Sequence, residues 1–166
     1  MPKSLLARDL IKVALDLANA ANQKPRQSHL RRATSTAYYA LFHCLANNCA
    51  DSIIGRGSGY GKQAWRQSYR ALQHGFAKSA CDRRSGKMKP ILDRFPDKIQ
   101  DFANLFYSMQ IKRHEADYDP YCNFNKSAVL ADIAAVEFAI AEFEESKLSD
   151  RKAFAALVLF KQPKLA

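Results

Sequence analysis

The chain has 166 residues, of which 48% are apolar and 25% are charged. This length and composition suffice for a folded domain with a sizeable core, and they argue against a disordered chain. Lysine and arginine exceed aspartate and glutamate by ten, which favours a polyanionic partner, nucleic acid before an anionic membrane surface. The same excess could serve solubility alone.

The four cysteines stand singly, at positions 44, 49, 81 and 122, and no Cys-x-x-Cys pair occurs. The N-terminus has no basic start followed by a long apolar run, so we expect no signal peptide. No apolar run approaches the roughly 20 residues that cross a bilayer. These observations predict a cytoplasmic protein without membrane contact, whose cysteines are small core residues.

Helical periodicity begins near Ser4, which can cap a first helix that ends before Pro25. Apolar residues recur along this helix at steps of four, three and four, and we expect them to face the core. They are Leu6, Leu10, Val13 and Leu17.

A second helix is predicted from Ser28 to about Ala50, and it is apolar on most sides, which is typical of the central helix of a bundle. Its remaining side carries hydrogen-bonding groups. They include Arg32, Ser35, Tyr39 and His43. We expect these groups either to line a site or to form a satisfied buried network that fixes the helix register.

Glycines at 55, 57, 59 and 61 predict a flexible connection after this helix. The segment is not a phosphate-binding P-loop. That motif would need glycine at 56 and serine or threonine at 63, where the chain has Arg56 and Gln63.

A third helix is predicted to turn its apolar residues inward, namely Trp65, Tyr69, Leu72 and Phe76. Trp65 and Tyr69 could stack on nucleic acid bases, but their helical spacing favours core packing. The histidines outside the second and fourth helices, His29 and His74, are predicted to be surface or packing residues.

Basic residues concentrate on the other side of the third helix and in the loop that follows. Between positions 62 and 89 there are eight of them against one acid, Asp82. This concentration favours a phosphate-binding surface, although a merely solvated face would look the same. The residues predicted to bind nucleic acid are Lys62, Arg66, Arg70, Arg83, Arg84, Lys87 and Lys89.

A fourth helix is predicted to start at Pro96 and to bury the stripe Ile99, Phe102, Phe106 and Met109. The next step of the stripe is Arg113, so this arginine should face neighbouring helices, where an unpaired charge is costly. Asp117 lies one turn further on, and Pro120 ends the helix. The two side chains could form an ordinary ion pair at a helix end.

A fifth helix, capped by Asn125, is predicted to bury Val129, Ile133, Val136, Ile140 and Phe143. A short last helix should run from Ser149 to near Phe160. No period-two alternation indicates a strand. The fold class predicted for residues 1–166 is therefore all-α, as a single domain with a four- to five-helix up-and-down bundle and a short C-terminal helix.

The polar groups of the second and fourth helices can meet in such a bundle. The candidate catalytic residues are Arg113, His114, Asp117 and Tyr118 on the fourth helix, with Arg32, Tyr39 and His43 on the second. Arginines bind phosphate, and a histidine or tyrosine can transfer a proton. These are the parts of a metal-independent RNA cleavage in which the 2′-hydroxyl is the nucleophile. No His-Glu-x-x-His or zinc spacing occurs, so neither a metal nor another cofactor is predicted.

Two of these stretches resemble a known family. The segment from Leu30 to His43, Leu-Arg-Arg-Ala-Thr-Ser-Thr-Ala-Tyr-Tyr-Ala-Leu-Phe-His, is similar to the Ser-x-Ala-Tyr-Tyr-Ala-x-Phe-His signature on the second helix of HEPN-domain proteins. Arg113-His-Glu-Ala-Asp-Tyr118 is similar to the Arg-x-x-Ala-Asp-Tyr ending of the fourth helix in one bacterial branch of that family. The segment from Trp65 to His74 also resembles that branch, and the likeness extends from about 28 to 145.

The resemblance implies a helical bundle, usually a homodimer, in a family rich in RNA-directed proteins. Many members are ribonucleases of toxin–antitoxin or antiviral defence systems, so a cognate antitoxin or a nucleotidyltransferase-type protein is an implied partner. Their active motif is an arginine and a histidine separated by four to six residues, supplied by both subunits. Arg113 matches the arginine, but positions 118 to 120 are Tyr, Asp and Pro. His114 is adjacent to Arg113, and a tyrosine such as Tyr118 is a poor base at neutral pH.

Two hypotheses follow for the function. The first is a HEPN-like, metal-independent endoribonuclease. The alternative is a non-catalytic HEPN module, whose basic segment binds RNA or an acidic partner protein and whose Arg113, Asp117 and Tyr118 tie the bundle together. A purely structural dimer is a third reading.

Overall fold

The structure is a computed structural model that describes residues 4–55 and 61–163. Within these ranges every regular element is a helix, and there are nine of them. The glycine-rich connection predicted after the second helix falls mostly outside the described residues, which include Gly55 and Gly61 but not Gly57 and Gly59.

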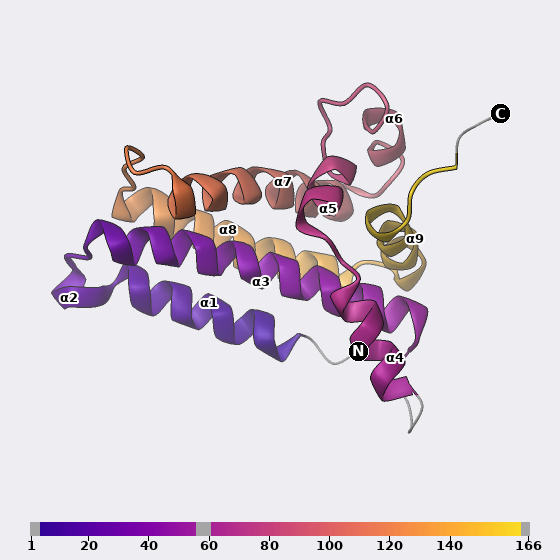
Figure 1. Ribbon diagram of the computed structural model, residues 1–166, viewed down its shortest axis with the longest axis horizontal. Helices are drawn as coiled ribbons and strands as arrows, with labels where there is room; N and C mark the ends of the chain where they lie inside the picture. The colour runs from indigo at the N-terminus through magenta and orange to yellow at the C-terminus, as the bar shows by residue number, and fades with distance from the viewer. Residues whose placement is uncertain (1–3, 56–60, 164–166) are drawn as a thin grey trace.

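Four helices are long, and they form the body of the bundle: α1 (Leu5–Ala18), α3 (Gln27–Ile53), α7 (Asp97–Tyr118) and α8 (Lys126–Glu145). The others are α2 (Ala20–Gln23), α4 (Gly61–Arg70), α5 (His74–Ala80), α6 (Lys89–Leu92) and α9 (Leu148–Leu159). Figure 1 shows α1, α7 and α8 lying along α3, with α4, α5 and α9 gathered toward its C-terminal end.

The all-α prediction is confirmed, and so is the short last helix, but the predicted count of four to five helices is too low. The segment predicted as one third helix divides into α4 and α5, because Gln73 is extended (φ −111°, ψ 130°) and interrupts the helical hydrogen bonding. The turn after α1 adds α2, which contains left-handed Ala21 and Asn22, and the segment around Pro90 adds α6.

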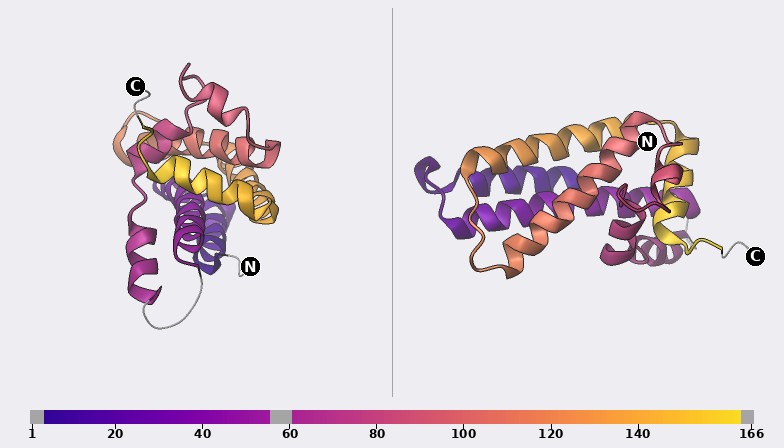
Figure 2. Two further views of the ribbon diagram at one scale, coloured as in Figure 1. Left: turned by 90° about the vertical axis from the view of Figure 1, so that its right-hand side faces the viewer. Right: turned by 90° about the horizontal axis from the view of Figure 1, so that it is seen from above.

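The central helix of the bundle is α3, as its apolar character on most sides predicted. Sixteen of its 27 residues are buried, and it packs against α1, α4, α7, α8 and α9. Figure 2 shows α4 and α8 on opposite sides of it. Its start differs from the prediction, because Ser28 lies inside the helix. Nδ1 of His29 instead accepts the backbone N–H of Arg26 at 3.2 Å.

The stripe predicted for the first helix is wrong, although its cap at Ser4 is confirmed by a hydrogen bond from the backbone N–H of Ala7 to Oγ. Leu6 and Val13 are 48% and 46% exposed. The buried residues of α1 are Ala7, Ile11, Ala14 and Ala18. Two apolar stripes run along this helix, and the one with more alanine is buried because small side chains allow close approach to α3.

The stripes predicted for the fourth and fifth helices are confirmed, since all of their apolar members are buried in α7 and α8. The two helices meet where the rings of Phe102 and Phe143 stack with centroids 4.2 Å apart. Phe154 of α9 contacts both rings edge-on, so the last helix closes this part of the core.

The loop from α7 to α8 is fastened to the start of α3. The Arg31 guanidinium donates to the carbonyl oxygens of Ala116 and Cys122, the former at 3.0 Å. The side chain of Gln27 exchanges two hydrogen bonds with the backbone of Phe124, at 2.7 and 2.9 Å. These contacts satisfy carbonyls near the C-terminus of α7, and they fix the last turns of α7 over the start of α3.

Within residues 4–55 and 61–163, no helix is long and apolar enough to cross a membrane.

We expect Phe102→Ala to lower the free energy of unfolding by about 3–5 kcal/mol, because it empties a fully buried ring site. The matched control is Phe138→Ala in α8, since Phe138 is 68% exposed; its effect should stay within about 0.5 kcal/mol. Urea unfolding followed by circular dichroism measures both, and equal losses would contradict the assignment of the core.

Candidate active site and basic surface

Arg113 lies against the aromatic side of α3. Its side chain is only 12% exposed, and its guanidinium carbon is 5.2 Å from the ring centroid of Tyr38 and 5.9 Å from that of Tyr39. Its Nη1 donates to Oδ2 of Asp117 over a long 3.4 Å, and Ser35 Oγ donates to the same oxygen at 3.3 Å. Nε is buried without a hydrogen-bond partner. Such a donor is uncommon in a folded protein, and it marks this arginine as incompletely neutralised.

His74, at the start of α5, lies in this cluster. Its Nδ1 and the Tyr38 hydroxyl oxygen are 2.6 Å apart, and its ring stacks on Phe42 with centroids 3.9 Å apart. Burial, the Arg113 charge and His43 together lower the pKa of His74. Burial raises the pKa of Tyr38 well above its ordinary value. At neutral pH the pair is therefore a neutral imidazole bonded to a protonated phenol.

A second histidine–tyrosine pair lies further along α3. Nδ1 of His43 and the hydroxyl oxygen of Tyr69 in α4 are 2.6 Å apart. Burial lowers the pKa of His43, and burial followed by the charge on Cys44 raises that of Tyr69 to about 12. This imidazole is also neutral at neutral pH.

Tyr39 connects the parts of the cluster. Its ring centroid is 6.3 Å from that of His43 and 5.9 Å from that of His74. The guanidinium of Arg113 lies over the ring of the preceding residue, Tyr38. The ring is half-buried. Two imidazoles and one guanidinium thus surround a single partly exposed tyrosine.

The other predicted catalytic residues lie elsewhere. Tyr118 is 67% exposed, and its ring contacts that of His114 with centroids 4.9 Å apart. These two side chains lie on a different ridge of α7 from Arg113 and Asp117, because adjacent helical residues project about 100° apart. Arg32 is exposed and bonds to no residue in the described part of the chain. The structure therefore brings Arg113, Asp117, Tyr39 and His43 together.

The prediction that His74 is a surface or packing residue missed its place in the cluster. His74 follows Tyr69 by five residues, which is not a helical spacing, because the chain leaves the helix between Arg70 and His74. Periodicity could not find this residue. The one signal available was its position in the Trp65–His74 segment that resembles the HEPN branch.

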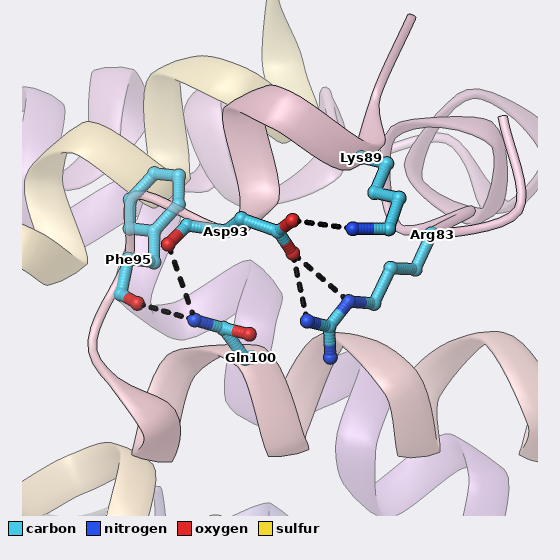
Figure 3. Close-up of polar contacts among 5 residues, drawn as sticks. All are labelled: Arg83, Lys89, Asp93, Phe95 and Gln100. Carbon is cyan, nitrogen blue, oxygen red and sulfur yellow. Dashed lines mark hydrogen bonds and ion pairs between the residues drawn. The ribbon is translucent and has the colours of Figure 1, made fainter. Parts of the chain in front are cut away.

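The predicted nucleic-acid-binding surface divides into two parts. In the loop and α6, Asp93 forms ion pairs with two of the predicted cations, Arg83 and Lys89, each with a contact of 2.7 Å (Figure 3). Arg84 pairs with Asp82 at 3.3 Å and lies over the ring of Tyr107. This half of the predicted surface is about half compensated, since the two carboxylates of Asp82 and Asp93 face the four cations Arg83, Arg84, Lys87 and Lys89.

The cations of α4 are different. Lys62, Arg66 and Arg70 are exposed, and none forms an ion pair with a described residue. Lys87 is likewise exposed and unpaired within the described ranges. Neither Trp65 nor Tyr69 is fully buried. The prediction of core packing is confirmed in part for Tyr69, which is half-buried against the core, whereas Trp65 lies outside the core cluster.

No metal site is evident among the described residues, since no three His, Cys, Asp or Glu side chains gather closely enough to hold an ion. No protein-family model, curated protein or solved structure matches the chain. The likeness to HEPN proteins therefore rests on the sequence motifs, and membership of that family stays a prediction.

The two histidines should make stability fall in mild acid. Their folded-state pKa values are lowered, so the unfolded chain binds protons more readily than the folded chain as the pH falls. Their contribution is complete above the unfolded value near pH 6.5, and it is lost as the pH falls below it. We expect the free energy of unfolding to drop between about pH 8 and about pH 5, and to drop less in His43→Gln/His74→Gln. Urea unfolding at both pH values tests this; an equal drop in wild type and variant would contradict it.

Proposed function

We propose that this chain is a HEPN-like, RNA-directed protein that cleaves RNA without a metal ion. The observation that carries the proposal is the placement of two neutral imidazoles, His43 and His74, around Tyr39, whose ring centroid also lies 5.9 Å from the guanidinium carbon of the incompletely neutralised Arg113. General acid–base catalysis on a phosphodiester needs two groups that exchange protons near pH 7 and a cation for the phosphate.

Arg113 binds the scissile phosphate in this account. Its bond to Asp117 is long, and Asp117 is shared with Ser35. A phosphate can therefore replace the carboxylate at little cost, and a guanidinium binds phosphate with paired, charge-assisted hydrogen bonds. The stacking of the guanidinium on Tyr38 holds it in place while the anion exchanges.

His74 is the base and His43 the acid. When Nδ1–H of His74 donates to the Tyr38 oxygen, Nε2 is free to accept the proton of the 2′-hydroxyl. The 2′-oxygen then forms a bond to phosphorus, and the bond from phosphorus to the 5′-oxygen breaks. His43, after taking up a proton from solvent to become an imidazolium, gives that proton to the 5′-oxygen, and the products are a 2′,3′-cyclic phosphate and a 5′-hydroxyl. The base role belongs to His74 because it lies nearer to the Arg113 charge, which keeps it neutral.

The pair takes the place of the histidine that the HEPN motif would put after Arg113. Both histidines come from the same chain as Arg113, so each protomer holds a full set of groups. The homodimer, the cognate antitoxin or nucleotidyltransferase-type partner, the toxin–antitoxin or defence role and the cytoplasmic location are further parts of the proposal, which the HEPN resemblance and the composition support.

A second candidate is a binding module without catalysis. The unpaired cations of α4 favour it, because they need no active site to bind RNA or an acidic protein. In this case the Arg113–Asp117 contact and the two histidine–tyrosine pairs serve only to fix α3, α4, α5 and α7 together.

We expect His74→Ala and Arg113→Ala each to reduce cleavage of a mixed RNA pool in EDTA by about 100-fold or more. His114→Ala is the matched control, since this exposed histidine is adjacent to Arg113 in the sequence but outside the cluster, and it should keep the wild-type rate. Rates are compared for variants whose circular dichroism and unfolding midpoint show that they fold.

Two results would contradict this assignment. Equal rates for His74→Ala and wild type would remove the histidine from the mechanism. A loss in His114→Ala with none in His74→Ala would return the proton-transfer role to His114, one of the candidates predicted from the sequence. Absence of cleavage by the wild type, with RNA retained on the protein in a salt-sensitive manner, would favour the binding module.

A further inference from the structure

Helix α4 contributes little to the core. None of its ten residues is buried, and it packs mainly against α3. Figures 1 and 2 show it standing away from the bundle at a steep angle to α3. A surface helix usually buries an apolar stripe, so the composition of α4 needs an explanation other than core packing.

The outer side of α4 is purely cationic and amide-bearing. Lys62, Arg66 and Arg70 recur at steps of four, which places one cation per turn, about 6 Å apart along the axis. No aspartate or glutamate occurs between positions 61 and 81. The charges are therefore available to an anion, in contrast to Arg83 and Lys89 in the neighbouring loop, which share an ion pair with Asp93.

Each of two cations follows directly after an aromatic residue. Trp65 precedes Arg66, Tyr69 precedes Arg70, and the two rings are 5.1 Å apart. Both rings are anchored at their polar ends, because Nε1 of Trp65 donates to Oδ1 of Asp51 at 2.8 Å and the Tyr69 hydroxyl bonds to His43. Both residues are partly exposed, and Tyr69 also stacks on the ring of His43 with centroids 5.9 Å apart. Aromatic rings anchored in this way between cations form a stacking platform. Their side chains would lose little conformational entropy when a base stacks on them.

The Trp65–Tyr69 platform is connected to the Arg113 cluster by contacts along α3. Trp65 contacts Asp51, Tyr69 contacts His43 and His74 contacts Tyr38, so successive contacts descend α3 toward Arg113. A ligand lying along α4 would enter the cluster at His43.

We propose that α4 binds single-stranded RNA on one flank of the scissile phosphate, with bases stacked on Trp65 and Tyr69 and phosphates on Lys62, Arg66 and Arg70. The inference rests on the proposed function, since it adds the substrate class to that site. A duplex keeps its bases stacked on one another and offers none to an aromatic platform, whereas single strands bind by stacking and phosphate contacts together.

The chain carries its own probe for this test. Trp65 is the one tryptophan in the sequence, so a base stacked on it should quench the whole tryptophan emission. The titrant is a single-stranded 2′-O-methyl RNA of mixed sequence, which lacks the nucleophile and cannot be cut by the proposed chemistry. Binding is thereby measured whether or not the protein is a ribonuclease.

We expect this strand to quench the emission at low salt, and a 2′-O-methyl duplex of the same sequence to quench it at least 10-fold more weakly. The variant Lys62→Gln/Arg66→Gln/Arg70→Gln should bind the single strand at least 10-fold more weakly. The slope of log affinity against log salt should become shallower by about 2, since each phosphate contact contributes about 0.7 for single strands.

The matched control is Lys12→Gln/Lys126→Gln/Lys147→Gln, which removes the same charge from α1, the start of α8 and the N-cap of α9. It should bind the strand nearly as tightly as wild type. Trp65→Leu should weaken binding of a fluorescein-labelled strand in anisotropy measurements, and Trp65→Phe should restore most of it.

Equal quenching by duplex and single strand would overturn the proposal, and so would equal losses in the two triple variants. Tight binding of poly-glutamate at the same salt, abolished by the α4 variant, would replace RNA with an acidic protein segment as the ligand. If cleavage is absent but α4-dependent binding of single strands is found, the proposed catalysis fails and this inference stands. If Arg113-dependent cleavage occurs and the α4 variant binds normally, the proposed catalysis stands and this inference fails.

Discussion

The stacking of Arg113 on the tyrosines of α3 is the contact on which the rest of the site depends. A guanidinium that is nearly buried needs partners, and the structure supplies aromatic faces and one shared carboxylate in place of a dedicated counter-ion. The arginine can take this position because the end of α7 is held over the start of α3 by Arg31. The fold thus holds the positive charge of Arg113 where the shared carboxylate of Asp117 compensates only part of it.

Burial sets the protonation state of the groups around that charge. Burial, with the Arg113 charge as the second cause, keeps His74 neutral, and burial alone keeps His43 neutral. The tyrosines bonded to these histidines retain their protons, since their pKa values are raised. Two neutral imidazoles near a cation suit proton transfer around a bound phosphate far better than they suit stability, because each must be held in a partly desolvated place. This contrast is the physical reason for preferring a catalytic or phosphate-binding role to a purely structural one.

The sequence predicted the parts of the molecule that depend on helical periodicity. The buried stripes of α7 and α8, the central position of α3 and the approach of Arg113 to α3 all follow from steps of three and four. The prediction from periodicity failed where two apolar stripes run along one helix or where a helix ends early. Alanine and leucine stripes both run along α1, and only the packing against α3 selects the alanines. The break at Gln73 turned one predicted helix into two and carried His74 into the site. The ion pair of Arg83 with Asp93 likewise depends on the turn between them, whereas the pair of Lys89 with Asp93 has the i,i+4 spacing of a helix.

The most direct measurement is the position and chemistry of a cut in a DNA strand that contains one ribonucleotide, incubated with the protein in EDTA. If the 2′-hydroxyl is the nucleophile, we expect a single cut on the 3′ side of that ribonucleotide, because no other position has a 2′-hydroxyl. The cut should leave a 2′,3′-cyclic phosphate and a 5′-hydroxyl. Cuts at deoxyribonucleotides, or products that end in a 3′-hydroxyl, would contradict the account, since water and not the 2′-oxygen would then be the nucleophile.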